Sequence, residues 1–359
     1  MEAILLVGGK GTRLRPLTIN TPKPMLPVAG VPFTAHQIAR ARDAGVTRIV
    51  LGTSYKAEVF ADYFGDGSDW GVELIYRTET EPLGTGGGIR YAAEALTCGP
   101  EDPVLVFNGD VLSGVDLRHL VARHEETDSA VTLYLTRVAD PRAFGLVPTD
   151  PDDRVIEFRE KPTTAAEIVT DQINAGCYVF RRDVIDRIPA GEVVSVERDT
   201  FPQLLAVGER LTGVVDEGYW LDLGTPLSFV QGSRDLVQGE VDSSAVPGDV
   251  GPALVQAGAE VAADAVLDGG TVVGPGCRIG PGARVSGSVL MGDVTVGTGA
   301  VVTDSVIATG AVIGESTHLA GVVVAERAGI GAGVELLAGA RVWPDVQLAD
   351  GSIRFSSDR

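Results

Sequence analysis

The sequence predicts an α/β protein with two domains: a Rossmann-like, mostly parallel sheet over residues 1–238, then a left-handed parallel β-helix of hexapeptide repeats over residues 257–359. Two observations support this prediction. Short apolar segments alternate with helical ones through the first two-thirds of the chain, which is the pattern of repeated βαβ units. Beyond residue 256 an aliphatic residue recurs about every six positions, which is the pattern of a β-helix.

The sheet domain is expected from apolar runs that have the length of strands and are separated by turn residues or helical stretches. A glycine loop follows the first strand, and a helix is expected over residues 35–44. Ligands of such folds lie at the carboxyl ends of the parallel strands, so we expect the site in the loops that follow the strands. The expected strands cover residues 4–7, 49–51, 73–76, 104–107, 130–136 and 177–180.

A polar stretch over residues 240–251, with Pro247 and two glycines, predicts a linker, whose limits we place at residues 239 and 256. The aliphatic repeat beyond it slips by one residue three times, where either a tight corner or a small loop is expected. A glycine-rich low-complexity tail is the alternative, and the regular period argues against it. The aliphatic positions are Val261, Leu267, Val273, Ile279, Val285, Leu290, Val296, Val302, Ile307, Ile313, Leu319, Val324, Ile330, Leu336 and Val342.

Composition and charge exclude several classes of function. The formal net charge of −20 argues against nucleic-acid and membrane partners, because both require a basic surface. No apolar run has the length of a membrane span, and the start of the chain lacks the features of a secretory signal. Three scattered cysteines predict no disulfide framework, and four histidines show no zinc spacing. We therefore expect a cytoplasmic protein that acts on small molecules.

The first strand leads into the loop Gly8-Gly9-Lys10-Gly11-Thr12-Arg13. It lacks the terminal Gly-Lys-Ser/Thr of a P-loop, and Leu14 stands where the Rossmann fingerprint has a third glycine. Glycines let backbone N–H groups approach phosphate oxygens, and the planar fork of Arg13 suits bidentate phosphate contacts. A simple tight turn is the alternative for the glycines alone. Further along, Lys23 lies between Pro22 and Pro24, which hold it on a stiff backbone.

This run resembles the sugar nucleotidyltransferase family, whose opening motif is Gly-Gly-x-Gly-Thr-Arg-Leu-x-Pro-Leu-Thr followed by Pro-Lys-Pro-Met. Within the family, sheet domain and hexapeptide tail together look like the actinobacterial mannose-1-phosphate guanylyltransferases. The resemblance implies that a sugar 1-phosphate attacks the α-phosphorus of a nucleoside triphosphate and releases pyrophosphate, with Mg²⁺ as cofactor. For this subfamily the implied substrates are GTP and mannose 1-phosphate, and the β-helix is expected to form a homo-oligomer.

The resemblance also implies roles for individual residues. Arg13, Lys23 and Lys161 are expected to bind the β- and γ-phosphates, the α-phosphate and the sugar phosphate, in that order. Asp110, in Asn-Gly-Asp after a strand, and Asp222, in Trp-Leu-Asp-Leu-Gly-Thr, are the expected magnesium ligands. The other expected nucleotide-binding residues are Leu6, Gly8, Gly9, Gly11, Thr12, Glu79, Gly84 and Thr85. The other expected sugar-phosphate residues are Gly109, Gly145, Glu160 and Asn174.

Glu79 is the candidate for reading the base. It begins a segment that resembles the Glu-Pro-Leu-Gly-Thr-Ala-Gly element of GDP-mannose pyrophosphorylases, with Gly86 in place of the more usual alanine. A carboxylate accepts from both N1–H and N2–H of guanine, whereas uracil, thymine and adenine each set an acceptor against it. The alternative is that Glu79 and Glu81 are solvated loop charges. The identity of the sugar follows from the resemblance alone.

Three other functions remain open. The nearest is a thymidylyl-, adenylyl- or uridylyltransferase that acts on glucose 1-phosphate, which the residue at position 79 distinguishes. A β-helix acyltransferase requires a catalytic histidine among the coils, where only His318 is available, in an expected turn. A catalytically silent homologue that senses a nucleotide sugar is the third, and the intact set of charged motif residues argues against it.

Overall fold

The computed structural model describes residues 1–54, 56–249 and 251–354, which form two compact units. Unit 1 comprises Met1–Gly9 and Gln37–Trp220, and unit 2 comprises Lys10–His36 and Leu221–Arg359. The segment Lys10–His36 therefore groups with the C-terminal part of the chain. Residue 250 of the expected linker and residues 355–359 of the expected β-helix lie outside the described residues.

Unit 1 is built on a mixed sheet whose strands run in the order β10-β9-β11-β6-β1-β4-β5, with β8 and β12 beyond β11. The neighbours β6, β1, β4 and β5 are parallel, whereas β11 is antiparallel to both β6 and β8. All six strands expected from the sequence are present. The strands of this sheet are β1 (Glu2–Leu6), β4 (Arg48–Thr53), β5 (Glu73–Thr78), β6 (Pro103–Asn108), β8 (Val131–Arg137), β9 (Gly145–Leu146), β10 (Arg159–Glu160), β11 (Gln172–Arg181) and β12 (Leu211–Val215). Strand β7 (Val111–Ser113) lies outside it.

The helices of unit 1 pack on this sheet around a buried aromatic cluster. The rings of Tyr178, Phe180 and Phe201 lie 5.3 to 6.1 Å apart, and all three are fully buried. Helix α4 starts where the Asp116 carboxylate caps two backbone N–H groups of the first turn. The helices are α2 (Glu58–Phe64), α3 (Gly84–Ala93), α4 (Leu117–Glu126), α5 (Arg182–Asp186) and α6 (Phe201–Ala206), with a π-helical turn η6 (Val196–Thr200); α1 (Phe33–Asp43) spans both units.

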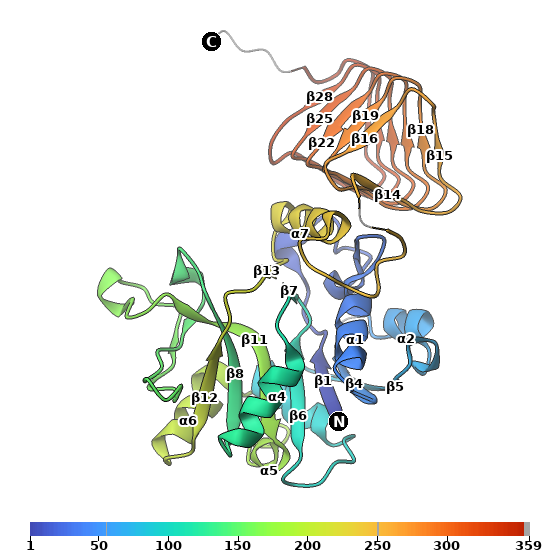
Figure 1. The fold of residues 1–359 in the computed structure, drawn as a ribbon. Coiled ribbons are helices and arrows are strands. Elements are labelled where there is room, and N and C mark those ends of the chain that lie inside the picture. The colour runs from blue at the N-terminus through green and yellow to red at the C-terminus, as the bar shows by residue number, and fades with distance from the viewer. Residues whose placement is uncertain (55, 250, 355–359) are drawn as a thin grey trace. The chain divides into compact units, whose positions relative to one another are not determined.

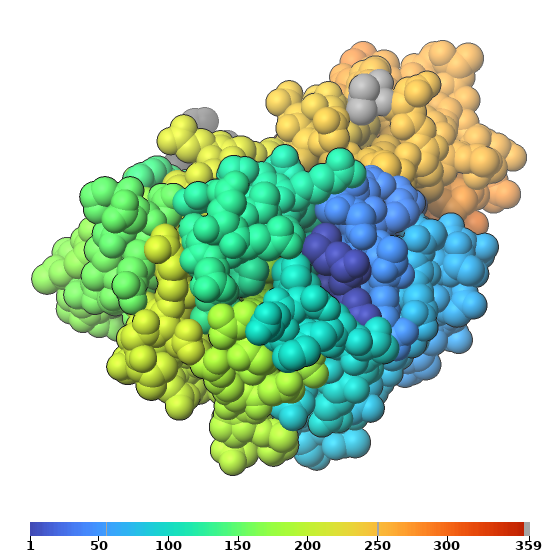
Figure 2. Space-filling model, turned by 60° about the horizontal axis from the view of Figure 1, so that its bottom comes forward, coloured from blue at the N-terminus to red at the C-terminus, as the bar shows by residue number. Residues whose placement is uncertain are grey.

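Because β6, β1, β4 and β5 are parallel, their carboxyl ends lie along one edge of the sheet, which we call the carboxyl edge. The segments that leave this edge include Gly8 after β1, Glu79 after β5 and Gly109 after β6. The start of the chain lies at the other edge, which comes forward in Figure 2, where the first residues (dark blue) reach the surface beside segments drawn in cyan. Unit 1 thus brings the loops expected to bind ligands to one edge.

Unit 2 contains the segment Lys10–His36, helix α7 and a β-helix. The segment holds the 3₁₀ turns η1 (Thr12–Leu14) and η2 (Lys23–Met25) and the short pair β2 (Pro27–Val28) and β3 (Val31–Pro32); β13 (Trp220–Asp222) spans both units. Helix α7 (Pro226–Gln238) has clear end signals: Thr225 and Ser228 form a capping box, Pro226 begins the helix, and Gly239 ends it at φ 79°.

The β-helix stacks short parallel strands into three flat faces, the arrangement of a left-handed β-helix of hexapeptide repeats (Figure 1). Its aliphatic residues, such as Val273, Leu290 and Ile307, fill the interior. Face 1 is β14 (Ala253–Val255), β17 (Thr271–Val273), β20 (Val289–Leu290), β23 (Val306–Ile307), β26 (Val323–Val324) and β29 (Arg341–Val342). Face 2 is β15 (Glu260–Val261), β18 (Arg278–Ile279), β21 (Thr295–Val296), β24 (Val312–Ile313), β27 (Gly329–Ile330) and β30 (Gln347–Leu348). Face 3 is β16 (Val266–Asp268), β19 (Arg284–Ser286), β22 (Val301–Thr303), β25 (His318–Ala320) and β28 (Glu335–Leu336).

The three slips in the aliphatic repeat are tight corners and not loops. Residue 260 pairs with 278, a coil of 18 residues, whereas 278 pairs with 295 and 295 with 312, coils of 17. The missing residue falls each time between face 3 and face 1, where Gly287, Asp304 and Gly321 have positive φ angles of 54°, 46° and 63°. Only two residues separate the strands at each of these corners, for example 287 and 288 between β19 and β20, so no loop is inserted there.

Candidate active site

The glycine loop starts at the carboxyl edge of unit 1. The backbone N–H of Val7 donates to Gly52 O at 2.9 Å, which extends the sheet by one residue beyond β1. A Cβ at Gly8 would lie 3.0 Å from Ser54 Oγ, and Gly9 has a φ of 106°. The close approach of Ser54 favours glycine at position 8, and the backbone conformation favours glycine at position 9.

In unit 2 the loop closes on the segment that carries Lys23. A Cβ at Gly11, whose φ is 54°, would lie 2.8 Å from Lys23 Cβ, and Thr18 Oγ1 donates to Gly11 O at 2.9 Å. The N–H of Leu14 donates to the same carbonyl at 3.0 Å, which begins the turn η1. Thr12 and Arg13 follow in that turn with exposed side chains. Gly11 thus joins the two motifs that the sequence expects to bind the triphosphate.

Asp222 lies between two cations of unit 2. Its carboxylate is 3.7 Å from Arg13 Nη2 and 3.9 Å from Lys23 Nζ. The side chain of Arg13 is 66% exposed, whereas that of Lys23 is only 11% exposed. A Cβ at Gly224 would lie 2.6 Å from the Arg13 guanidinium, so any larger residue at this position would displace the Arg13 side chain. Three of the five charged residues expected to act in catalysis therefore form one cluster, although they lie up to 209 positions apart (13 to 222).

Glu79 follows β5 at the carboxyl edge of unit 1 and folds back toward helix α3. Its Oε2 accepts from the N–H of Leu83 at 3.2 Å, and its Oε1 lies 2.6 Å from where a Cβ at Gly88 would be. Burial raises the pKa of this carboxyl, whereas the side chain of Glu81 is exposed. The alternative of two solvated loop charges is therefore wrong for Glu79.

The N-terminus of α3, which carries Gly84 and Thr85, is held by a segment more than 100 residues away. The carbonyl oxygen of Val194 accepts from the N–H groups of Gly86 and Gly87 at 2.8 and 3.2 Å. Thr85 Oγ1 donates to Glu197 Oε2 at 2.8 Å and accepts from the N–H of Val196 at 2.9 Å. A Cβ at Gly86 would lie 2.9 Å from Val194 Cγ1, which explains why glycine stands there. Sequence reasoning missed this support, since no local motif links the two segments.

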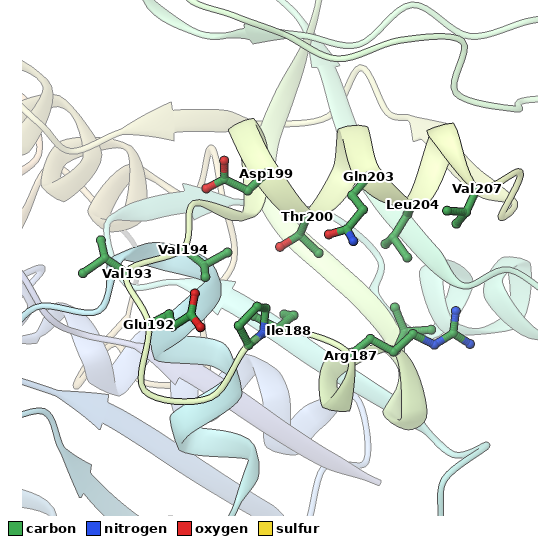
Figure 3. Close-up of a pocket in the computed structure, with 12 residues that line it drawn as sticks. Arg187, Ile188, Glu192, Val193, Val194, Asp199, Thr200, Gln203, Leu204 and Val207 are labelled. Atoms are coloured by element: carbon green, nitrogen blue, oxygen red, sulfur yellow. The ribbon is translucent and has the colours of Figure 1, made fainter.

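The same segment forms the wall of an open pocket of about 510 Å³ (Figure 3). Thr200 and Leu204 lie on η6 and α6, Val194 lies on the loop before η6, and Ile188 lies across the pocket from the helix. The pocket contains none of the residues that the sequence singled out. Its lining is Val184, Arg187, Ile188, Pro189, Glu192, Val193, Val194, Asp199, Thr200, Gln203, Leu204 and Val207.

Three of the expected sugar-phosphate residues lie together on β9 and β10. Gly145 is the register partner of Glu160, and a Cβ at Gly145 would lie 2.7 Å from Glu160 Oε2. The next residue, Lys161, has a φ of 49°, and its N–H donates to Phe144 O at 3.1 Å. Its Nζ lies 3.4 Å from Glu160 Oε1, and its side chain is largely exposed. This local turn presents a cation beside a carboxylate.

Asn174 lies on the neighbouring strand β11, at a bulge in the pairing with β8. Its Nδ2 donates to Tyr178 Oη at 2.7 Å, and its Oδ1 accepts from the N–H of Gly176 at 3.2 Å. Burial raises the pKa of Tyr178 well above its usual value, so the phenol stays protonated. The Trp220 indole donates to Ala175 O at 3.1 Å. Sequence reasoning did not single out Tyr178, since its contact with Asn174 depends on the bulge.

Gly109 and Asp110 follow β6 at the carboxyl edge. The N–H of Gly109 donates to Leu6 O at 2.9 Å, and a Cβ at Gly109 would lie 2.5 Å from the same oxygen. Leu6 therefore binds this turn through its backbone. Asp110, half-buried, is the second residue of this turn, which joins β6 to β7.

The five charged residues expected in catalysis thus fall into two sets. Arg13, Lys23 and Asp222 cluster in unit 2, and Asp110 and Lys161 lie in unit 1. Both aspartates supply hard carboxylate oxygens, which suit a divalent cation that also binds phosphates. His318, expected in a turn, is instead the first residue of β25 and is exposed on face 3.

Comparison with known proteins identifies the family. The family model described as nucleotidyl transferase matches residues 2–239, and that described as the GMPPB C-terminal domain matches residues 250–353. The chain belongs to the nucleotidyl transferase family. Nucleotidyl transferases of this family generally use a divalent metal ion.

This nucleotidyl transferase is 55% identical over 359 residues to a mannose-1-phosphate guanylyltransferase of Mycobacterium tuberculosis, covering all of this chain and 98% of the relative. It is 38% identical to a probable mannose-1-phosphate guanylyltransferase 1 of rice (Oryza sativa subsp. japonica) over 65% of this chain and 64% of that one. Among solved structures, HddC from Yersinia pseudotuberculosis complexed with GMP-PN is 28% identical with a TM-score of 0.55, over 65% of this chain and 97% of HddC. Across residues 1–54, 56–249 and 251–354, none of the helices has the length and apolar character to cross a membrane.

Proposed function

We propose that this nucleotidyl transferase transfers a guanylyl group from GTP to α-D-mannose 1-phosphate, forming GDP-mannose and pyrophosphate. The observation that carries the proposal is the similarity to the mycobacterial mannose-1-phosphate guanylyltransferase, which extends over the whole chain. The β-helix is included in this similarity, which covers all 359 residues of the chain.

The geometry of Glu79 supports guanine as the base. The carboxylate lies at the carboxyl edge, where nucleotides bind in parallel sheets, and it is fixed by Leu83 N–H and the surface of Gly88. A carboxylate held in one orientation accepts two parallel N–H groups, which guanine alone among the common bases presents on its Watson–Crick edge next to a carbonyl. In this proposal the other expected contacts to the nucleotide come from the backbone of the glycine loop and of Gly84 and Thr85.

The chemistry requires positioning more than proton transfer. The attacking phosphate oxygen of the sugar is already an anion, so no general base is needed. The obstacle is repulsion between two polyanions and the charge that develops on the departing pyrophosphate. We assign Lys161 to the attacking sugar phosphate, Lys23 to the α-phosphate and Arg13 to the β- and γ-phosphates. Glu160 and Asn174 are assigned to sugar hydroxyls, with Gly109 and Gly145 at the same ligand through their backbones.

Asp110 and Asp222 are the residues that would hold a Mg²⁺ ion, which would supply positive charge to neutralise the phosphates. The environment of Asp222 fits this role. Its carboxylate is 3.7 Å from the guanidinium of Arg13 and 3.9 Å from the ammonium group of Lys23, distances longer than a hydrogen bond. Both cations would also be near a phosphate bound at this carboxylate. Lys23, Arg13 and Asp222 would then act on one triphosphate.

The deciding experiment measures pyrophosphate release with Mg²⁺ for four triphosphates (GTP, ATP, UTP and dTTP), each with mannose 1-phosphate and with glucose 1-phosphate. GTP with mannose 1-phosphate should give the highest kcat/KM. Preference for dTTP, ATP or UTP with glucose 1-phosphate would instead assign the chain to the related glucose-specific activity. No release with any pair would favour a silent nucleotide-sugar sensor.

We also propose that the β-helix mediates a homo-oligomer. Face 2 presents outward residues that include Val312, which is 50% exposed, and Arg278. Flat faces of parallel strands suit self-association. Light scattering of the wild type and of Val312→Glu tests this, because a charge at a buried interface would dissociate the oligomer. If Val312→Glu had the same oligomeric mass as the wild type, face 2 would not be the interface.

A further inference from the structure

Face 1 of the β-helix is covered by other parts of unit 2. Inward residues of its strands, such as Leu290 and Ile307, fill the coil interior. The alternate residues Val289 and Val306 point out of the coil, yet they are only 1% and 0% exposed. The equivalent outward position on face 2, Val312, is 50% exposed. Face 1 is therefore an internal packing surface of unit 2 and not a free surface.

One element that covers face 1 is helix α7. A Cβ at Gly270, next to β17, would lie 2.9 Å from Arg234 Cα, so the helix backbone approaches the corner of the coil directly. The Arg234 guanidinium donates to Asp304 Oδ1 at 2.8 Å, at one of the short corners two coils further along. Helix α7 also contacts the segment Lys10–His36, because Ser233 Oγ accepts a hydrogen bond from the N–H of Ala29 at 2.9 Å.

The segment Lys10–His36 itself makes three side-chain contacts with the β-helix. Gln256 Nε2 donates to Gly30 O at 3.0 Å near the first coil. Asn20 Nδ2 donates to Glu326 Oε2 at 2.7 Å near the last coils. Arg341, on the final strand of face 1, contacts the turn η1. The segment that carries Arg13 and Lys23 is thus held at both of its ends by the β-helix.

The contact of Arg341 falls directly on the backbone of the expected phosphate loop. Its Nη1 donates to Arg13 O at 3.0 Å and to Arg15 O at 2.5 Å. These carbonyls lie on either side of Leu14, whose side chain is fully buried. One cationic nitrogen that bridges two carbonyls fixes the direction of the chain between them, and hence the direction in which the Arg13 side chain leaves.

We propose that Arg341 is a positioning residue for triphosphate binding: it holds the turn Thr12–Leu14 so that Arg13 and the loop backbone meet the β- and γ-phosphates, with the pair Asn20–Glu326 as a second tie. This rests on the proposed function, in which that turn binds the triphosphate of GTP. Arg341 acts through the backbone of the loop. The β-helix therefore contributes to nucleotide affinity without a side chain assigned to the substrate.

The test compares Arg341→Ala, Arg341→Lys and the control Arg284→Ala, which removes an exposed arginine from face 3 of the same β-helix. The KM for GTP should rise about three- to tenfold in Arg341→Ala, the range expected for loss of an exposed charged hydrogen bond. The KM for mannose 1-phosphate should stay within about twofold of wild type. Arg341→Lys, which keeps one cationic donor, should recover part of the loss, and Arg284→Ala should match wild type.

A second readout uses the unliganded enzyme. Hydrogen exchange of the N–H groups of Leu14, Arg15 and Leu17, which close the turns after Gly11, should be faster in Arg341→Ala than in wild type. This readout tests whether Arg341 holds the turn even if the wild type failed to use GTP. Failure to use GTP would contradict the proposed function alone. Equal exchange in the two proteins would overturn the inference, as would faster exchange with an unchanged KM for GTP. If Arg341→Ala did not fold, Glu326→Ala, which removes the acceptor of Asn20 Nδ2, should show the same pattern at smaller amplitude, and its absence there would also overturn the inference.

Discussion

The carboxylate of Glu79 rests against the α-carbon of Gly88, with Oε1 only 2.6 Å from where a Cβ would be. Gly88 lies inside helix α3, where glycine is costly because it loses more conformational freedom than alanine. The position is thus a compromise between helix stability and space for the carboxylate. Two predictions separate these effects.

Gly88→Ala should preserve or slightly raise thermal stability, because alanine is favoured in a helix by roughly 0.5–1 kcal/mol. The new methyl group should displace the Glu79 carboxylate, so the preference for GTP over ATP should fall at least about fivefold while the KM for mannose 1-phosphate changes little. Gly114→Ala is the matched control, since its Cβ would meet Tyr219 only at ordinary contact distance, 3.7 Å. Unchanged base selectivity in Gly88→Ala would argue that Glu79 does not read the base.

Glu79→Gln should lower kcat/KM for GTP by roughly tenfold or more, because the amide presents a donor where guanine also presents one. Activity with the other triphosphates should fall less or rise. Initial rates with all four triphosphates measure this, and Glu81→Gln, at an exposed position of the same loop, serves as the control. If both variants kept the wild-type selectivity, base recognition would lie elsewhere.

Lys23→Ala and Lys161→Ala should each reduce kcat/KM by about a hundredfold or more and leave the unfolding midpoint nearly unchanged. Both lysines lie in turns and not in the hydrophobic core, so folding depends on them little. Lys161→Ala should raise the KM for the sugar phosphate more than Lys23→Ala does. Arg284→Ala, which removes an exposed cation from face 3, controls for the change in net charge. Wild-type turnover in either lysine variant would contradict the role assigned to that residue.

Acid should destabilise the protein through buried histidines. Burial lowers the pKa of His124 on helix α4 from its usual 6.5 to about 4. The folded state then binds the proton less tightly than the unfolded chain does. The free energy of unfolding is therefore unaffected by this histidine above about pH 6.5, and it falls by up to about 1.4 kcal/mol per pH unit as the pH decreases toward 4. His36, which contacts Val28 O and Ser243 Oγ, has its pKa lowered to about 4 by burial as well and should add a similar loss.

Thermal unfolding between pH 7.5 and 4.5 measures this effect. His124→Gln should flatten the pH dependence, because the glutamine takes up no proton in this range. His119→Gln, an exposed position on the same helix, is the control and should keep the wild-type slope. Parallel curves for all three proteins would show that His124 does not contribute.

Much of the fold could be predicted from periodicity, and the failures have physical reasons. All six expected strands are present because each is an apolar run that is stable only when buried in a sheet. The pairs β2–β3 and β9–β10 were not predicted, since strands of two residues exist only through their tertiary partners. The slips of the hexapeptide repeat were left open between corner and loop. The structure identifies the slips as corners, because only two residues separate the strands at each of them, such as 287 and 288 between β19 and β20.

The candidate site shows a similar division. The motifs located Arg13, Lys23 and Asp222, which the structure brings into one cluster. The supports of those motifs were not found, because they come from segments that are remote in sequence and carry no signature. Val194 O binds the start of α3 through backbone groups alone, and Arg341 contacts carbonyl oxygens, so neither contact depends on a local pattern of side chains.

The contacts of Arg341 with the turn at Arg13 join residues 328 positions apart. A ribosome synthesises the glycine loop 328 residues before Arg341, so throughout that interval the loop lacks the partner that contacts it. A chain that stops before Arg341 would carry every motif proposed to bind the nucleotide and would hold its glycine loop loosely. If Arg341 positions this loop as proposed, binding of the triphosphate by a nascent chain should strengthen only after Arg341 has been synthesised.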